Sequence, residues 1–164
     1  MIQRVQTLFL IGIIICMALE MSMPIWEKSN TEKGITYTLD AFYWREFTTT
    51  KEPGAQPQLM VEKTVIYLAV LCIASALVAL YSIFQYRRRM FQMKLGALNA
   101  FLMMALIAAA TYLIYNGENA IGSSEKGAFR IGYFLPLAAM IMNSLANRFI
   151  KRDENLVKSV DRIR

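Results

Sequence analysis

The run TVIYLAVLCIASALVALYSIFQY, residues 64–86, decides the expected fold class of this chain. It contains no charged residue, and as an α-helix it would be roughly 34 Å long at about 1.5 Å per residue. The hydrocarbon core of a bilayer is about 30 Å thick, so the run predicts a membrane-spanning helix. It ends at three consecutive arginines, Arg87, Arg88 and Arg89.

Three further apolar runs, at about residues 5–26, 95–115 and 128–147, are of similar length. The last contains Pro136, which a membrane helix tolerates when neighbouring helices satisfy the freed carbonyl. Hydrophobic residues make up 56% of the 164 residues and charged residues 18%, against about 25% charged in an average soluble domain. We therefore expect an all-α membrane protein, with a bundle of four transmembrane helices over residues 1–147.

The distribution of lysine and arginine predicts the orientation of these spans. Most of the 18 basic residues fall in the segments that share one side if the N-terminus is cytoplasmic. Basic residues near span ends favour the cytoplasmic side. The sequence thus predicts a multi-pass protein of the bacterial inner membrane, with both termini in the cytoplasm and residues 27–63 outside.

The outer loop, residues 27–63, has a β pattern. Apolar and polar residues alternate over Gly34–Asp40, and an aromatic run that includes Trp44 follows. Alternation with period two is typical of a strand, so we expect one or two strands in a small extracytoplasmic segment. Trp44 is a candidate contact for an outer partner.

Residues 148–164 form a basic tail with helical periodicity. Phe149, Leu156 and Val160 lie on one stripe and charges fill the remaining positions. Such a cytoplasmic amphipathic helix can lie on anionic lipid, bind ribosomal RNA through its arginines, or dock on a partner protein. Acids interspersed among the basic residues favour protein contact. The candidate partner-binding residues of the loop and tail are Arg87, Arg88, Arg89, Arg148, Lys151, Arg152, Asp153, Glu154 and Arg162.

Polar residues within the spans are candidate functional sites, because burying a polar group in lipid is unfavourable and such residues are therefore rare without a functional role. Glu20 stands near the outer end of the first run. It is either a proton or cation site, or an interfacial carboxylate paired with Lys28 or Lys63. Asn99, Asn143 and Asn147 are suited to hydrogen bonds between helices. Small residues at the spacings Cys72-x-x-x-Ala76 and Gly96-x-x-x-Ala100 predict that the second and third spans pack together.

No catalytic or metal-binding pattern is present in the sequence. Histidine is absent, and the two cysteines, Cys16 and Cys72, lie inside apolar runs. The chain therefore has no evident general base, and no cysteine in a polar setting could act as a nucleophile. We expect no enzyme activity, no cofactor and no bound metal.

The two ends of the chain carry a resemblance. MIQRVQT at residues 1–7 and LANRFIKRDENLVKSVDRIR at residues 145–164 resemble a family of uncharacterised small four-helix inner-membrane proteins of Bacteroidota, a domain of unknown function. The resemblance implies a bacterial inner-membrane location and no particular activity.

The functional expectation is a non-catalytic accessory subunit of a larger inner-membrane complex, of the protein export, insertion or respiratory type. Its partners would be integral membrane proteins of that complex, contacted through the cytoplasmic loop and tail, with anionic lipid at the same face. The alternative is a small transporter or channel that uses Glu20 and the intramembrane asparagines.

Overall fold

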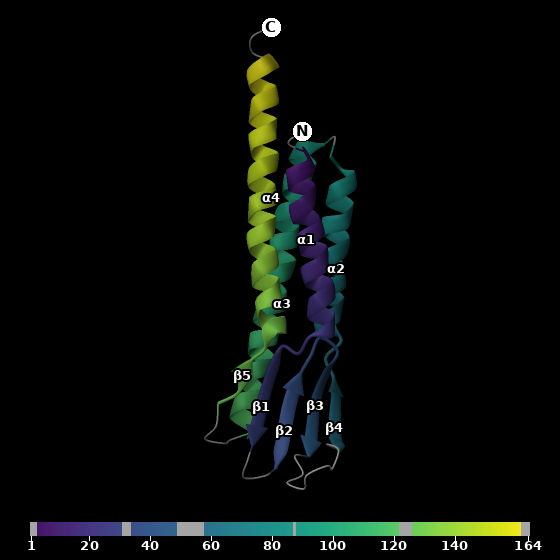
Figure 1. The fold of residues 1–164 in the computed structure, drawn as a ribbon, viewed down its shortest axis with the longest axis vertical. Helices are drawn as coiled ribbons and strands as arrows, with labels where there is room; N and C mark the ends of the chain where they lie inside the picture. Colours follow the sequence, from purple (N-terminus) through teal and green to yellow (C-terminus); the bar gives the residue numbers. More distant parts are fainter. Residues whose placement is uncertain (1–2, 31–33, 49–57, 87, 122–125, 162–164) are drawn as a thin grey trace.

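The computed structural model of the chain describes residues 3–30, 34–48, 58–86, 88–121 and 126–161. The helices in these ranges are α1 (Gln3–Ser22), α2 (Tyr67–Phe84), α3 (Arg89–Ile121) and α4 (Ile131–Asp161). The strands are β1 (Trp26–Asn30), β2 (Ile35–Leu39), β3 (Tyr43–Thr48), β4 (Leu59–Thr64) and β5 (Ala128–Phe129). Figure 1 shows the helices as one bundle, with the strands gathered at one end of it.

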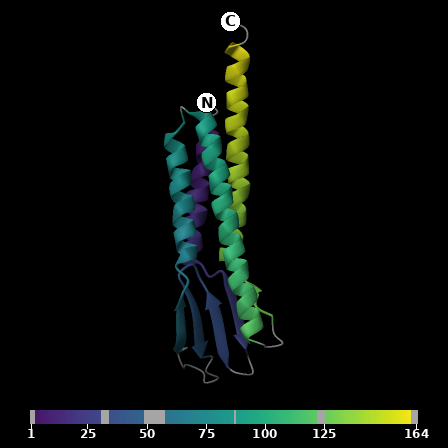
Figure 2. The ribbon, with the colours of Figure 1, turned by 180° about the vertical axis from the view of Figure 1, so that it is seen from behind.

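Each helix of the bundle packs against two neighbours, in the cyclic order α1, α2, α3, α4. On α1 the buried residues Leu10, Ile13 and Met17 recur at intervals of three and four, which places them on one helix face. At the end of the bundle away from the sheet, α1 begins, α2 ends, α3 begins and α4 ends (Figures 1 and 2). Consecutive helices therefore run in opposite directions.

The strands form one antiparallel sheet in the order β4-β3-β2-β1-β5. Asp40 shapes the turn from β2 to β3, because its Oδ1 accepts hydrogen bonds of 2.8 Å from the backbone N–H groups of Phe42 and Tyr43. The short β5 comes after α3 in the chain and pairs with β1, so that Phe129 lies opposite Trp26. The sheet thus joins segments from before α2 and after α3.

The expected all-α fold class is wrong, because the structure combines four helices with a five-stranded sheet. The expected strands over residues 34–40 and 42–47 are present as β2 and β3. The sequence pattern did not predict β1, because Trp26 continues the first apolar run. It did not predict β5 either, because only two residues of this strand pair. Strand pairing of this kind depends on residues far apart in sequence, as between Trp26 and Phe129.

The expected number of spans is also wrong. Within the described residues three helices are long and apolar enough to cross a membrane, Val5–Ser22, Tyr67–Phe84 and Arg89–Ile121. This is compatible with a membrane protein. α4 is not among them, since its apolar half contains Pro136 and Asn143 and passes directly into the charged residues from Arg148 onward.

Two helices run further than the apolar runs indicate. α3 has 33 residues, about 50 Å at 1.5 Å per residue, and continues through Asn116–Asn119, where the sequence predicts its end. The continuation is stabilised by the sheet, since Gly117 lies against Trp44 of β3 and Glu118 accepts a hydrogen bond from Lys28 of β1. α4 is one helix across residues 147 and 148, so the amphipathic tail continues it without a break.

Candidate binding pocket between the sheet and α3

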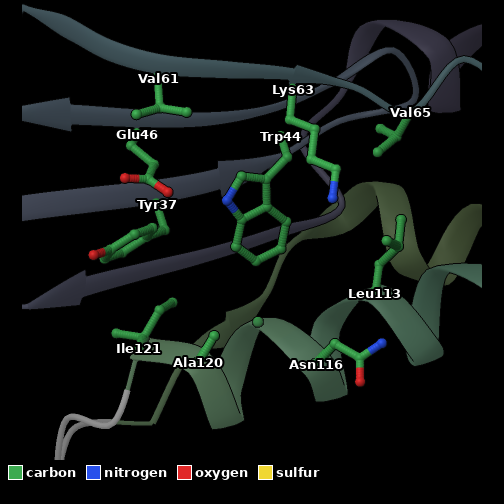
Figure 3. A pocket seen from close by; sticks show the side chains of 11 residues that line it. Tyr37, Trp44, Glu46, Val61, Lys63, Val65, Leu113, Asn116, Ala120 and Ile121 are labelled. Carbon is green, nitrogen blue, oxygen red and sulfur yellow. The ribbon is translucent and has the colours of Figure 1, made fainter.

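A pocket of about 370 Å³ lies between the sheet and the final turns of α3 (Figure 3). β2, β3 and β4 form one wall and α3 forms the other. Its lining combines aromatic, aliphatic and charged side chains: Tyr37, Trp44, Glu46, Val61, Lys63, Val65, Leu113, Asn116, Gly117, Ala120 and Ile121.

The register of the sheet explains why these side chains meet. In one row across the strands, Leu39 lies opposite Trp44 and Trp44 opposite Lys63. In the next row, Tyr37 lies opposite Glu46 and Glu46 opposite Val61. Residues two apart on a strand share a face, so both rows point toward α3. The members of the two rows, β1 included, are Trp26, Leu39, Trp44 and Lys63, then Lys28, Tyr37, Glu46 and Val61.

Trp44 is the central side chain of the pocket (Figure 3). Its ring stacks on that of the fully buried Trp26, with 5.4 Å between the ring centroids. The outer edge of its six-membered ring lies against Gly117 of α3, where a Cβ atom would collide with it. The missing side chain at Gly117 therefore allows α3 to approach the sheet closely.

The end of α3 is fixed to the sheet by Glu118. Its Oε2 accepts a hydrogen bond of 2.6 Å from Nζ of Lys28, and its Oε1 accepts one of 2.7 Å from the backbone N–H of Gly127. The Lys28 side chain is 1% exposed, so this ion pair is largely shielded from water on the β1 side. The α3 wall of the pocket is thereby held against β1.

The chemistry of the lining is that of a binding site. Burial, together with the nearby Glu46 carboxylate, raises the pKa of the Tyr37 hydroxyl above its usual value, so this side chain stays neutral and can donate a hydrogen bond at physiological pH. Glu46 and Lys63 add one charge of each sign. Among the described residues of the lining there is no nucleophile paired with a base.

The pocket borders an exposed edge of the sheet. All six residues of β4 are exposed, and Leu59, Met60 and Val61 are 50%, 58% and 48% exposed. Figure 2 shows the end of α3 beside β1, on the far side of the sheet from β4. β4 therefore presents an exposed strand edge, apolar over its first three residues and polar over Glu62, Lys63 and Thr64, that no described element covers.

The predicted partner-binding residues of the loop and tail lie at the opposite end of the molecule. Arg88, Arg148, Lys151 and Arg152 are exposed there. Arg87 and Arg162 lie outside the described residues.

Two elements at this end are tied together. Nη1 of Arg89 donates a 2.9 Å hydrogen bond to the backbone carbonyl of Asp153, whose side chain is buried, and Glu154 beside it is half-buried. Arg89 and Asp153 are therefore engaged within the chain, which leaves the four exposed basic residues as the available surface.

Glu20 lies inside the bundle, not at a wet interface. It is 1% exposed, and the Cys72 thiol of α2 donates a hydrogen bond to its Oε2. Neither expected lysine pairs with it, because Lys28 is bonded to Glu118 and Lys63 lines the pocket.

Of the pocket residues, the sequence singled out Trp44 alone as a site. Tyr37 and Gly117 were missed, and Lys28, which lies outside the lining, was considered only as a partner of Glu20, because each gains its role from a residue on another element. A signal was present for β1, where Trp26, Lys28 and Asn30 alternate with exposed or half-buried residues. A lysine on the apolar side of that alternation indicates a buried partner.

The chain belongs to the family described as Domain of unknown function (DUF4293), which it matches over residues 2–163. No curated protein matches it.

Proposed function

We propose that this member of the DUF4293 family is a membrane-embedded accessory protein without catalytic activity, whose sheet binds an extended segment of a partner protein outside the membrane. The observation that carries the proposal is β4, an edge strand exposed along its whole length beside a pocket with aromatic, aliphatic and charged side chains.

The exposed edge favours an added strand. An edge strand offers a row of backbone N–H and C=O groups, and proteins that do not use such an edge usually shorten, charge or cover it. β4 has six residues, and its first three are the apolar Leu59, Met60 and Val61. A partner segment paired with β4 would satisfy the backbone groups and bury these side chains.

The pocket supplies specificity for such a segment. Val61 and Lys63 of β4 belong to its lining, so a strand added beside β4 passes directly along its rim. An aromatic or large aliphatic side chain of the partner would pack on Trp44, and Glu46 or Lys63 would contact a polar neighbour. In added-strand complexes the main chain supplies affinity and the pockets select side chains.

The proposed setting is the inner membrane of a bacterium of the Bacteroidota, with the sheet outside and the opposite end of the bundle, where α1 begins, toward the cytoplasm. The exposed Arg88, Arg148, Lys151 and Arg152 support this orientation, since basic residues at span ends favour the cytoplasmic side. They are available to anionic lipid and to the cytoplasmic parts of the same complex, which would be of the protein export, insertion or respiratory type.

The test is site-specific photocrosslinking in cells at native expression levels. A photoreactive amino acid is placed at Met60 on β4 or, as a control on the same sheet, at the exposed Ser29 of β1. We expect one defined adduct from position 60 and none from position 29. Met60→Lys, which adds a charge to the edge, should reduce recovery of the same partner in mild detergent at least tenfold.

Identical adducts from both positions, or full recovery with Met60→Lys, would contradict the proposal. An adduct between two copies of this chain would replace the partner protein with self-association through β4.

A further inference from the structure

The interior of the bundle contains polar atoms that lack hydrogen-bond partners. Among the described residues, five buried side-chain nitrogen or oxygen atoms have none, and four of them lie between the helices: Ser82 Oγ, Gln92 Oε1, Asn99 Nδ2 and Asn143 Oδ1. All four residues are at most 2% exposed. Unpartnered polar atoms are rare inside proteins, and four of them in one bundle call for an explanation.

These residues form successive levels along the bundle axis. Ser75 of α2 donates a 2.6 Å hydrogen bond to Oδ1 of Asn99 on α3. On the same face of α3, one turn closer to its start, the carbonyl of Gly96 accepts a 2.8 Å bond from Asn143 of α4.

The series continues to both ends of the bundle. One further turn along α3, Gln92 donates a 3.1 Å bond to the carbonyl of Ser82 on α2. In the other direction, Cys72 stands one turn from Ser75 on α2 and contacts Glu20 near the end of α1. Polar groups therefore follow one another from the start of α3 to the sheet end, at steps of about 5 Å.

The unpartnered atoms are complementary at each level. Asn99 Nδ2 is a donor and Asn143 Oδ1 is an acceptor. Asn99 of α3 accepts its bond from Ser75 of α2, and Asn143 of α4 donates to the carbonyl of Gly96, one turn from Asn99 on α3. Ser82 Oγ can donate and Gln92 Oε1 can accept. One water molecule bridging each pair would satisfy all four atoms, which is how buried polar groups without protein partners are usually stabilised.

We propose that this column is a water-bridged proton path that ends at the carboxylate of Glu20. A proton enters as hydronium at the level of Gln92 and Ser82 and passes between waters held by the amides. It then binds a Glu20 oxygen and forms the neutral acid. Release to water at the sheet end restores the carboxylate, so no other bond changes. This extends beyond partner binding by the sheet and does not depend on it.

The surroundings of Glu20 suit this role. The ionisable group that faces it from α2 is the Cys72 thiol. Among the described residues no basic side chain lies within ion-pair distance of Glu20. Its charge is therefore not neutralised by a fixed partner, so the carboxylate is available to a mobile proton.

The test is proton uptake by liposomes that contain the purified protein and a pH-sensitive dye, driven by a potassium diffusion potential. We expect the pH of the lumen to change at least tenfold faster in liposomes with the wild-type protein than in protein-free liposomes. Glu20→Gln should reduce the rate to that of protein-free liposomes. The control is Thr111→Val, which removes an exposed hydroxyl outside the column and should leave the rate unchanged.

Two results would overturn the proposal: a wild-type rate equal to that of protein-free liposomes, or a Glu20→Gln rate equal to wild type. If Glu20→Gln does not fold, Asn99→Leu tests the same proposal, because it removes the amide that bridges two levels. Its rate should also fall to that of protein-free liposomes, and retention of the wild-type rate would exclude the path.

Discussion

Lys28 of β1 and Glu118 of α3, which are 90 positions apart in sequence, form an ion pair of 2.6 Å at the junction of the sheet and the bundle. The lysine side chain is 1% exposed and that of the glutamate 30%. Since Glu118 also accepts the N–H of Gly127, one carboxylate connects β1, the end of α3 and the segment that leads into β5. The position of the pocket wall depends on this connection.

Glu118→Ala should lower stability by about 3 kcal/mol, because it leaves a buried ammonium group without a partner. The matched control is Glu27→Ala, which breaks the exposed pair of Glu27 with Arg130 and should cost less than about 1 kcal/mol. Thermal unfolding of both variants in detergent measures the difference. Equal unfolding midpoints of the two variants would show that the Lys28–Glu118 pair stabilises the protein no more than the exposed pair does.

Gly117→Leu should move Trp44, because a side chain at this position occupies the space of the indole ring. We expect a change in tryptophan fluorescence and loss of the photoadduct at Met60. Asn119→Leu, two residues further along α3 at an exposed position, should change neither. An unaltered photoadduct at Met60 in the Gly117 variant would show that partner binding does not depend on the pocket.

Gly96→Leu should separate α3 from α4, since a Cβ at Gly96 meets the amide of Asn147. Overpacking of this kind costs about 1–3 kcal/mol. Ala97→Leu, at the exposed neighbouring position, should be close to neutral. Unfolding in a series of detergent mixtures compares the two variants, and a similar loss in both would argue against a specific contact at Gly96.

Arg89→Ala removes the hydrogen bond from its guanidinium to the carbonyl of Asp153. We expect backbone amides of α4 around residue 153 to exchange with deuterium about tenfold faster, as a bond from a charged donor contributes about 1.5 kcal/mol. Arg88→Ala is the control, because Arg88 is exposed beside it. Unchanged exchange in the Arg89 variant would mean that packing alone holds this part of α4.

The proposed orientation can be measured by labelling single cysteines, because Cys16 and Cys72 are buried and give a low background. Ser29→Cys should react with a membrane-impermeant maleimide added outside the inner membrane. Lys151→Cys should react only after that membrane is permeabilised. The reverse pattern would place the sheet in the cytoplasm.

The partial agreement between sequence and structure has a physical explanation for particular elements. α2 packs on α3 as predicted, and Ser75 contacts Asn99 there, but Cys72 of the predicted motif contacts Glu20 of α1. Gly96, assigned to the same contact, instead faces Asn147 of α4. A spacing motif reports that a helix can be approached closely, but it does not report which neighbour approaches.

The sequence by itself determined the apolar helices, the strands β2 and β3 and the basic character of one end, because each follows from residues close together in the chain. Only the tertiary structure decided that Lys28 pairs with Glu118, that Glu20 is enclosed beside Cys72 and that Trp44 lines a pocket. These depend on contacts between distant segments, and β pairing and ion pairing carry no local periodicity from which the partner could be read.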